Sequence, residues 1–140
     1  MSFWWIPAII LVALLIISFY KRYSMIKNMD SNAIESPNLI ILTDSDYKKQ
    51  IKSGVSLIDF WAPWCMPCKV QGPIINEVAN EMGNNAAICK INIDQNKRAA
   101  AEFGVRSIPT IIIFKNGKVV KQLVGVKSKT VLVKALASFI

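Results

Sequence analysis

Hydrophobic residues lie in two differently organised parts of the chain, and a polar segment separates them. Residues 3–20 form one apolar run without a charged side chain. Residues 24–37 are polar, follow no helical or strand period and end in proline, as is typical of a tether. From residue 38 onward, short apolar runs alternate with stretches in which apolar residues recur every three to four positions. The pattern predicts an apolar helix, a linker and one globular domain over residues 38–140.

Within residues 38–140 the pattern predicts nine elements in the order βαβαβαββα. Thr43 or Asp44 is the expected cap of the first helix, Pro73 kinks the second, and Asn116 with Gly117 forms a hairpin turn. Alternating strands and helices followed by a hairpin predict an α/β fold with a mixed central sheet flanked by helices. The predicted strands cover residues 39–43, 56–61, 87–93, 110–115 and 118–124, and the predicted helices cover 44–51, 67–82, 97–103 and a last segment capped by Ser128.

The apolar run at residues 3–20 has the length of a membrane span. Eighteen helical residues extend about 27 Å, close to the bilayer core of about 30 Å. Tryptophans stand near its start and tyrosines near its end, as in an aromatic belt. A cleaved signal peptide is the alternative, but no Lys or Arg precedes the run and no small-residue cleavage site follows it. We therefore expect an uncleaved single-pass anchor over residues 1–23.

Basic residues flank only one side of this segment. Lys21, Arg22 and Lys27 follow the apolar run. The positive-inside rule then predicts that the globular domain lies in the cytoplasm. An extracytoplasmic domain is the alternative orientation.

Composition restricts the chemistry that the domain can perform. The chain has 140 residues with 17 Lys and Arg, nine Asp and Glu, and no histidine. Without histidine, Ser-His-Asp catalysis, Cys-His catalysis and HExxH zinc sites are excluded. Only three cysteines are present, which excludes a disulfide-rich scaffold and a four-ligand Cys/His site within one chain. We expect no metal ion and no bound cofactor.

The net charge of +8 raises the question of an acidic partner. The lysines are spread over several predicted elements and no nucleic-acid-binding motif accompanies them, so we expect no nucleic-acid partner. Attraction to anionic lipid headgroups, attraction to acidic proteins and an ordinary solvated surface remain three alternatives. We expect the chain to be a monomer.

Cys65 and Cys68 form a C-x-x-C pair between a predicted strand and a predicted helix. At this helical spacing their Cα atoms can reach disulfide distance. Cys65 would lie at the helix N-terminus, where free N–H groups and the helix dipole favour the nucleophilic thiolate. Cys68, one turn further, would be more buried and suited to resolving a mixed disulfide. A purely structural disulfide and half of a zinc site shared by two chains are the alternatives.

Asp59 and Lys90 are charged residues inside two apolar strands. A carboxylate in such a place is costly to bury, so it should find a partner or hold a proton near neutral pH. Lys90 is the expected partner, and a proton held by Asp59 could be exchanged with Cys68. The alternative is a solvated charge at the end of a strand. Cys89, beside Lys90, is expected to be a small buried hydrophobic residue, and a regulatory thiol is the alternative.

Several segments resemble the thioredoxin family in the order found there. Residues 58–69 read IDFWAPWCMPCK and resemble its active-site signature. The resemblance continues through KINID at 90–94, FGVRSIPT at 103–110, FKNG at 114–117 and VG at 124–125. It spans residues 38–140 and implies a thioredoxin fold with protein-disulfide reductase activity. It also implies disulfide-containing protein substrates and an electron-donating reductase as partners.

The resemblance assigns a role to each matching residue. Cys65 matches the nucleophile, Cys68 the resolving cysteine, Asp59 the proton shuttle and Lys90 its partner, while Pro109 matches a cis-proline opposite the disulfide. The expected substrate groove comprises Trp61, Trp64, Met66, Pro67, Ile108, Pro109 and Gly125.

One departure concerns the dipeptide between the cysteines. The family's commonest pair is Gly-Pro, whereas this chain has Met66 and Pro67. This dipeptide affects the redox poise and the docking of partners, and the retained proline favours a reductase. An extracytoplasmic oxidoreductase for cytochrome maturation or disulfide repair is the main alternative. A redox-independent docking subunit is a further one, against which the intact cysteine pair argues.

Overall fold

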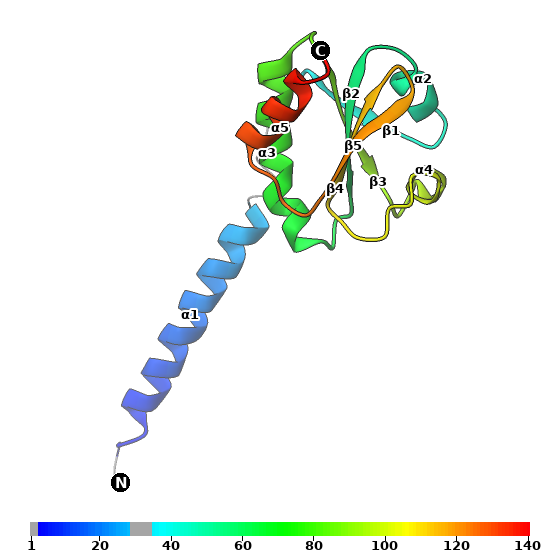
Figure 1. Ribbon diagram of the computed structural model, residues 1–140. Helices are drawn as coiled ribbons and strands as arrows, with labels where there is room; N and C mark the ends of the chain where they lie inside the picture. The colour runs from blue at the N-terminus through cyan, green and yellow to red at the C-terminus, as the bar shows by residue number, and fades with distance from the viewer. Residues whose placement is uncertain (1–2, 29–34) are drawn as a thin grey trace. The chain divides into compact units, whose positions relative to one another are not determined.

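The computed structural model describes residues 3–28 and 35–140, coloured along the chain in Figure 1. The chain divides into two compact units, residues 1–34 and 35–140. The predicted linker covers residues 24–37, but residues 24–28 continue the first helix and Ser36 is buried in the second unit. The central part of that linker, residues 29–34, lies outside the described residues.

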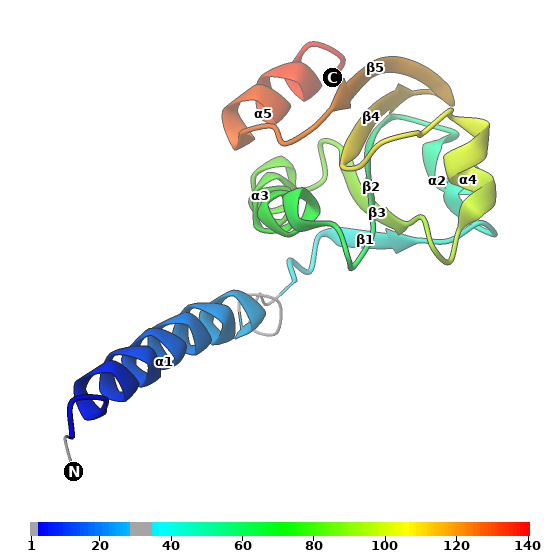
Figure 2. The same cartoon turned by 90° about the horizontal axis from the view of Figure 1, so that it is seen from below.

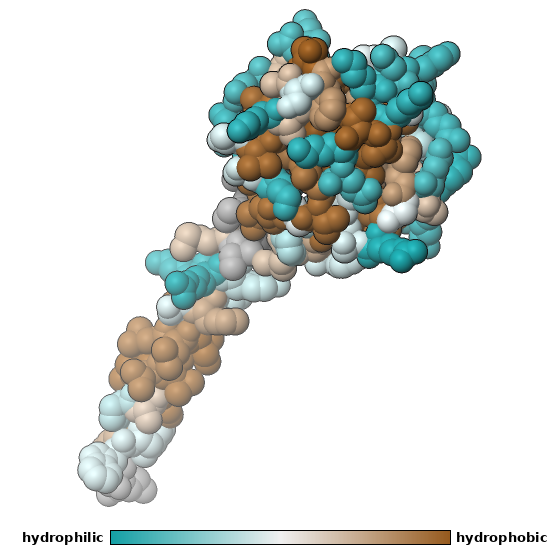
Figure 3. All heavy atoms as spheres, viewed as in Figure 1, coloured by the Kyte–Doolittle hydropathy of each residue, from teal (hydrophilic) through white to brown (hydrophobic). Residues whose placement is uncertain are grey.

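Helix α1 (Ile6–Asn28) forms the described part of the first unit. Its segment Ile6–Met25 is long and apolar enough to span a membrane, and none of it is buried. Figure 3 shows an apolar surface over the middle of this helix. The helix begins three residues later than the apolar run, and Pro7 stands in its first turn, where the missing N–H costs least. Length and composition fit a membrane span and also fit a signal sequence.

The second unit is built on a five-stranded sheet in the order β1-β3-β2-β4-β5. Strands β1, β3 and β2 run parallel to one another, whereas β4 is antiparallel to β2 and β5 is antiparallel to β4. The predicted mixed sheet is therefore confirmed. The bounds of the strands are β1 Leu39–Leu42, β2 Val55–Trp61, β3 Ala87–Asn92, β4 Thr110–Lys115 and β5 Lys118–Val124.

Two pairs of helices cover the two faces of this sheet, as Figure 2 shows. Side chains alternate along β2, so that Leu57 enters the core beneath α3 and α5 while Ile58 enters the core beneath α2 and α4. The order of the nine predicted elements is confirmed. The bounds of the helices are α2 Tyr47–Ile51, α3 Met66–Met82, α4 Lys97–Glu102 and α5 Lys129–Ala137.

The predicted cap of the first domain helix is wrong. Helix α2 begins only at Tyr47, with Asp46 at its N-cap position and no side-chain cap bond. The Asp44 carboxylate instead accepts hydrogen bonds from the backbone N–H groups of Arg98 (3.2 Å) and Ala99 (2.8 Å) at the start of α4. Asp44 therefore caps a helix that lies more than fifty residues further along the chain. The predicted cap of α5 is confirmed, because the Ser128 hydroxyl accepts from the Val131 N–H.

Candidate active site

The C-x-x-C pair lies where the central strand β2 passes into helix α3. Cys65 occupies the N-cap of α3 with an extended backbone (φ −88°, ψ 110°), and Pro67 stands in the first turn. Proline is well tolerated there because its absent N–H would have no intrahelical partner. The predicted position of Cys65 at the start of a helix is thus confirmed.

Cys65 and Cys68 form a disulfide with a Cα–Cα distance of 5.3 Å. The Cys68 backbone N–H donates a hydrogen bond to Cys65 Sγ over 3.2 Å. After reduction, this N–H and the helix dipole favour a negative charge on Cys65 Sγ. Burial does not distinguish the two cysteines as expected, since Cys65 is 5% and Cys68 is 4% exposed. Their roles must therefore follow from position on the helix rather than from depth.

The peptide bond between Ile108 and Pro109 is cis, as the family resemblance implied. The Ile108 carbonyl oxygen lies 3.7 Å from Cys65 Sγ, so it can accept a hydrogen bond from the Cys65 thiol after reduction. Gly125 donates its N–H to the Pro109 carbonyl over 2.9 Å. Its φ of +84° lies in the left-handed region, which explains glycine at this position. The cis-proline loop and the loop after β5 therefore form one wall beside the disulfide.

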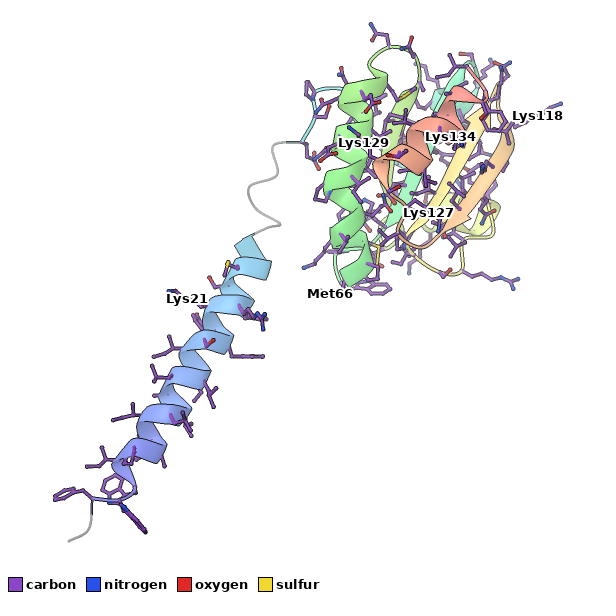
Figure 4. All side chains as sticks on the ribbon, turned by 60° about the vertical axis from the view of Figure 1, so that its left-hand side comes forward. Lys21, Met66, Lys118, Lys127, Lys129 and Lys134 are labelled. Carbon is purple, nitrogen blue, oxygen red and sulfur yellow. A yellow bond between two sulfur atoms is a disulfide. The ribbon has the colours of Figure 1, made fainter. Side chains whose placement is uncertain are left out.

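Exposed apolar side chains surround the buried sulfur atoms. Trp64 is 67% exposed and Met66 is 56% exposed, and Figure 4 shows Met66 at the N-terminal end of α3. Pro67 is also exposed. The Trp64 Nε1–H donates to the Asp94 carboxylate, with a distance of 3.0 Å to Oδ2. Sequence reasoning gave Asp94 no role, although its place just after β3 puts it at the same sheet edge as the end of β2.

Asp59 is fully buried in the middle of β2 and pairs in register with Lys90 of β3. The alternative of a solvated strand-end charge is therefore wrong. Neither carboxylate oxygen has a hydrogen-bond partner among the described residues. Burial raises the pKa of Asp59 to about 7, and the positive charge of Lys90 opposes that rise. A buried carboxyl group with a pKa near neutrality is thus present, and its role as a proton shuttle stays a prediction.

Lys90 contributes its charge without a direct hydrogen bond to Asp59. Its Nζ lies 4.6 Å from the centroid of the Trp61 ring, a cation–π arrangement. Helix α3 closes over it at Gly72, where an added Cβ would lie 3.9 Å from Nζ. The half-buried ring of Trp61 and the helix therefore hold the ammonium group in place.

The remaining cysteine takes no part in this arrangement. Cys89 is fully buried and unpaired, and burial raises the pKa of its thiol to about 12. Such a thiol stays protonated at neutral pH and is a poor nucleophile. Among residues 3–28 and 35–140, no group of three or more His, Cys, Asp or Glu side chains could hold a metal ion.

A family model described as Thioredoxin matches residues 38–138, almost all of the unit that holds this site. The chain belongs to the thioredoxin family. It is 44% identical over 98 residues to a thioredoxin from Staphylococcus epidermidis, which covers 70% of this chain and 94% of that protein. It is also 44% identical over 94 residues to a thioredoxin from Bacillus subtilis, which covers 67% of this chain and 90% of that protein.

A solved structure agrees with this assignment. A mutant thioredoxin from Halobacterium salinarum is similar with a TM-score of 0.68 at 29% sequence identity. The match covers 76% of this chain and 96% of that one. The thioredoxin fold and thiol–disulfide oxidoreductase activity are therefore established for this chain. Residues 1–37, which contain α1, lie outside the family match.

Sequence reasoning missed Gln71, a fully buried residue on α3 of the thioredoxin domain. Its Nε2 donates to the Lys127 carbonyl (3.1 Å), and its Oε1 accepts from the Lys127 N–H (2.7 Å). These two bonds tie α3 to the loop that contains Gly125. A signal was available, because Gln71 is a polar residue on the same helical stripe as the buried Ile75 and Val78.

Replacing Asp59 with asparagine should change the pH dependence of stability. The pKa of the Asp59 carboxyl group is about 7 in the folded domain, whereas the ordinary pKa of an aspartate side chain in water is 3.8. The stability that it contributes is therefore fully present below pH 3.8 and lost as the pH rises through about 7. We expect Asp59→Asn to match the parent near about pH 4 and to exceed it by up to about 4 kcal/mol above about pH 8.

Urea unfolding of the oxidised full chain in detergent micelles, at both pH values, measures this difference. A difference that is the same at both pH values would contradict the account of Asp59.

Replacing Gln71 with leucine should loosen the loop beside the disulfide. Two backbone groups of Lys127 lose their partners, and a hydrogen bond of this kind contributes about 1 kcal/mol. We expect Gln71→Leu to raise KM for a protein disulfide by about fivefold while kcat and the reduction of a small aromatic disulfide change little. Gln122→Leu on the exposed strand β5 is the matched control. Equal losses on both substrates would show that Gln71 has only a structural role.

Proposed function

We propose that this chain is a membrane-tethered protein-disulfide reductase. The observation that supports the proposal most directly is that two features occur in one domain. Cys65 caps helix α3, and the buried carboxyl group of Asp59 has no hydrogen-bond partner among the described residues. A redox-independent docking subunit would need neither feature, and a purely structural disulfide would not need Asp59. The family membership and the retained Pro67 support the direction of electron flow toward substrates.

In the first step, the Cys65 thiolate attacks one sulfur of a substrate disulfide. A Cys65–substrate disulfide forms, the substrate S–S bond breaks, and the released substrate thiolate takes a proton from water. The Cys65 sulfur atom is flanked by the exposed side chains of Trp64 and Met66. It is also flanked by the wall that Ile108, Pro109 and Gly125 form, so an extended substrate segment can lie between these side chains and the wall.

In the second step, Cys68 attacks Cys65 Sγ. The Cys68 proton passes to the Asp59 carboxylate, the Cys65–Cys68 disulfide forms, and the second substrate sulfur leaves as a thiolate. Two electrons have then moved from the dithiol to the substrate. A pKa of about 7 suits Asp59 for this exchange, because acid–base groups act best near the working pH. A dithiol-supplying reductase returns the pair to the reduced form.

The tether is helix α1, with the span predicted at about residues 3–20. The described helix supports this by its length and apolar composition. The exposed Lys21 and Arg22 follow its apolar part, and they support a cytoplasmic thioredoxin domain under the positive-inside rule. In that compartment a soluble reductase can supply electrons, whereas an extracytoplasmic domain would need an electron path across the membrane.

Serine variants of the cysteines test the proposed chemistry. Cys65→Ser should abolish reduction of insulin disulfides, because no nucleophile remains. Cys68→Ser should also stop turnover but should accumulate a mixed disulfide, visible on a non-reducing gel and cleared by dithiothreitol. Cys89→Ser is the control and should keep its activity, since its buried thiol is not used. Full activity of Cys65→Ser would overturn the proposal.

Asp59→Asn tests the proton transfer separately. We expect insulin reduction at about pH 7 to slow by about tenfold, because Cys68 loses its acceptor group. The Cys68→Ser variant should form its mixed disulfide at the same rate with or without Asp59→Asn, since the first step does not use Asp59. Unchanged turnover of the Asp59→Asn variant would exclude the shuttle role.

Protease access tests the tether and its orientation. A tag at the C-terminus, in sealed protoplasts, should resist an added protease and become sensitive after lysis. The tag should stay with the membrane fraction in high salt, and a variant without residues 1–28 should be released. Digestion before lysis would assign the domain to the outer side, and recovery of the full chain in the soluble fraction would exclude the tether.

A further inference from the structure

Charge is distributed unevenly along the thioredoxin domain. Residues 35–102 contain seven basic and eight acidic side chains. Residues 103–140 contain seven basic side chains and no acidic one. The net positive charge of the domain therefore comes entirely from its C-terminal third, a type of asymmetry that indicates an anionic partner.

The fold gathers most of this charge on β5, α5 and the loop between them. Strand β5 forms an edge of the sheet, and its Leu123 packs with α5 residues such as Leu132 in one core cluster. The Lys115 ammonium group donates to the Phe139 carbonyl, which links the end of β4 to the segment after α5. Figure 4 labels four of these lysines. We define the basic face as Lys115, Lys118, Lys121, Lys127, Lys129 and Lys134.

Most of this charge is not neutralised within the described residues. Lys129 forms an ion pair with Glu81 over 3.0 Å. Lys115 and Lys127 donate to backbone carbonyls, which leave their charge in place. No ion pair is found in residues 3–28 and 35–140 for the remaining three, which are exposed: Lys118, Lys121 and Lys134.

Exposed apolar side chains are interleaved with these lysines. Val126 in the loop after β5 is 40% exposed, and Val131 on α5 is 45% exposed. A mixture of lysine and aliphatic side chains fits the boundary between anionic headgroups and acyl chains. A nucleic acid would be expected to meet aromatic stacking residues, and residues 115–134 contain none on this face. Lysines also protect edge strands from pairing, but that role does not explain Lys134 on α5.

We propose that the basic face docks the thioredoxin domain onto anionic lipid headgroups of the bilayer that α1 spans. This inference rests on the membrane tether proposed above. The tether confines the domain near the surface, so that individually weak contacts suffice to hold it there. Each lysine near an anionic surface strengthens association by about fivefold at moderate salt.

Lysine footprinting of the full chain in lipid nanodiscs tests this. The chain is reconstituted in discs of phosphatidylcholine alone or of phosphatidylcholine mixed with phosphatidylglycerol, and a water-soluble acylating reagent is applied. We expect acylation of Lys118, Lys121 and Lys134 to slow by about fivefold in the anionic discs and to recover in high salt. Lys49 on α2 and Lys97 on α4 are exposed on the other face of the sheet, so they serve as internal controls and should react alike in both discs. Equal rates for the basic face in both discs would overturn the proposal.

A matched pair of variants separates the face from net charge. Lys118→Gln/Lys121→Gln/Lys134→Gln should remove the lipid-dependent protection of Lys115 and Lys127, whereas Lys48→Gln/Lys49→Gln/Lys97→Gln on α2 and α4 should keep it. Protection by soluble polyglutamate in neutral discs, equal to that in anionic discs, would instead identify an acidic protein partner and overturn the lipid assignment. A chain that does not co-elute with neutral discs would show failure of the tether itself, which the footprint ratio does not measure.

Discussion

The chemistry of this domain depends on a helix that begins at the carboxyl end of a strand in the middle of the sheet. That junction gives Cys65 a hydrogen bond from the Cys68 N–H and the favourable end of the helix dipole. Because β2 lies between β3 and β4, both neighbours contribute to the site. Strand β3 supplies Lys90 and the segment before β4 supplies Pro109. The reactive sulfur therefore depends on the strand order as much as on its own motif.

The same position in the sheet explains the buried carboxyl group. Asp59 occupies a core position of β2, where an apolar residue would stabilise the fold more. Lys90 lies near enough to moderate its charge but is held over the Trp61 ring. The result is an acid that changes its protonation near neutral pH. Natural proteins commonly break a packing rule at the residues that function requires.

Local patterns predicted the elements and the centre of the site, because both depend on short-range features. The order of strands and helices followed from apolar periodicity, and the capping position of Cys65 followed from its place before a helical stripe. Asp59 and Lys90 stood out as charges in apolar strands. The cis bond before Pro109 was expected only from the family resemblance, since most X–Pro bonds are trans.

The features that were missed depend on contacts between distant segments. Asp44 caps α4 rather than its own helix, and Gln71 bonds to a residue more than fifty positions away. Asp94 meets Trp64 because two parallel strands end at the same edge. The nearly equal burial of Cys65 and Cys68 reflects the surrounding loops, which the sequence spacing of the pair does not describe.

The proposed membrane span of α1 and the proposed lipid contact of the basic face concern where in the cell the reaction takes place. A tethered reductase would act on disulfides that arise close to the bilayer. The central claim, that electrons flow from Cys65 and Cys68 to substrates, depends on the reduction potential of this pair with Met66 and Pro67 between the cysteines. Equilibrating the full chain with defined dithiol buffers measures that potential. We predict a value close to the one known for thioredoxin, about −270 mV, and a value near that of a strong oxidant, about −120 mV, would contradict electron flow toward substrates.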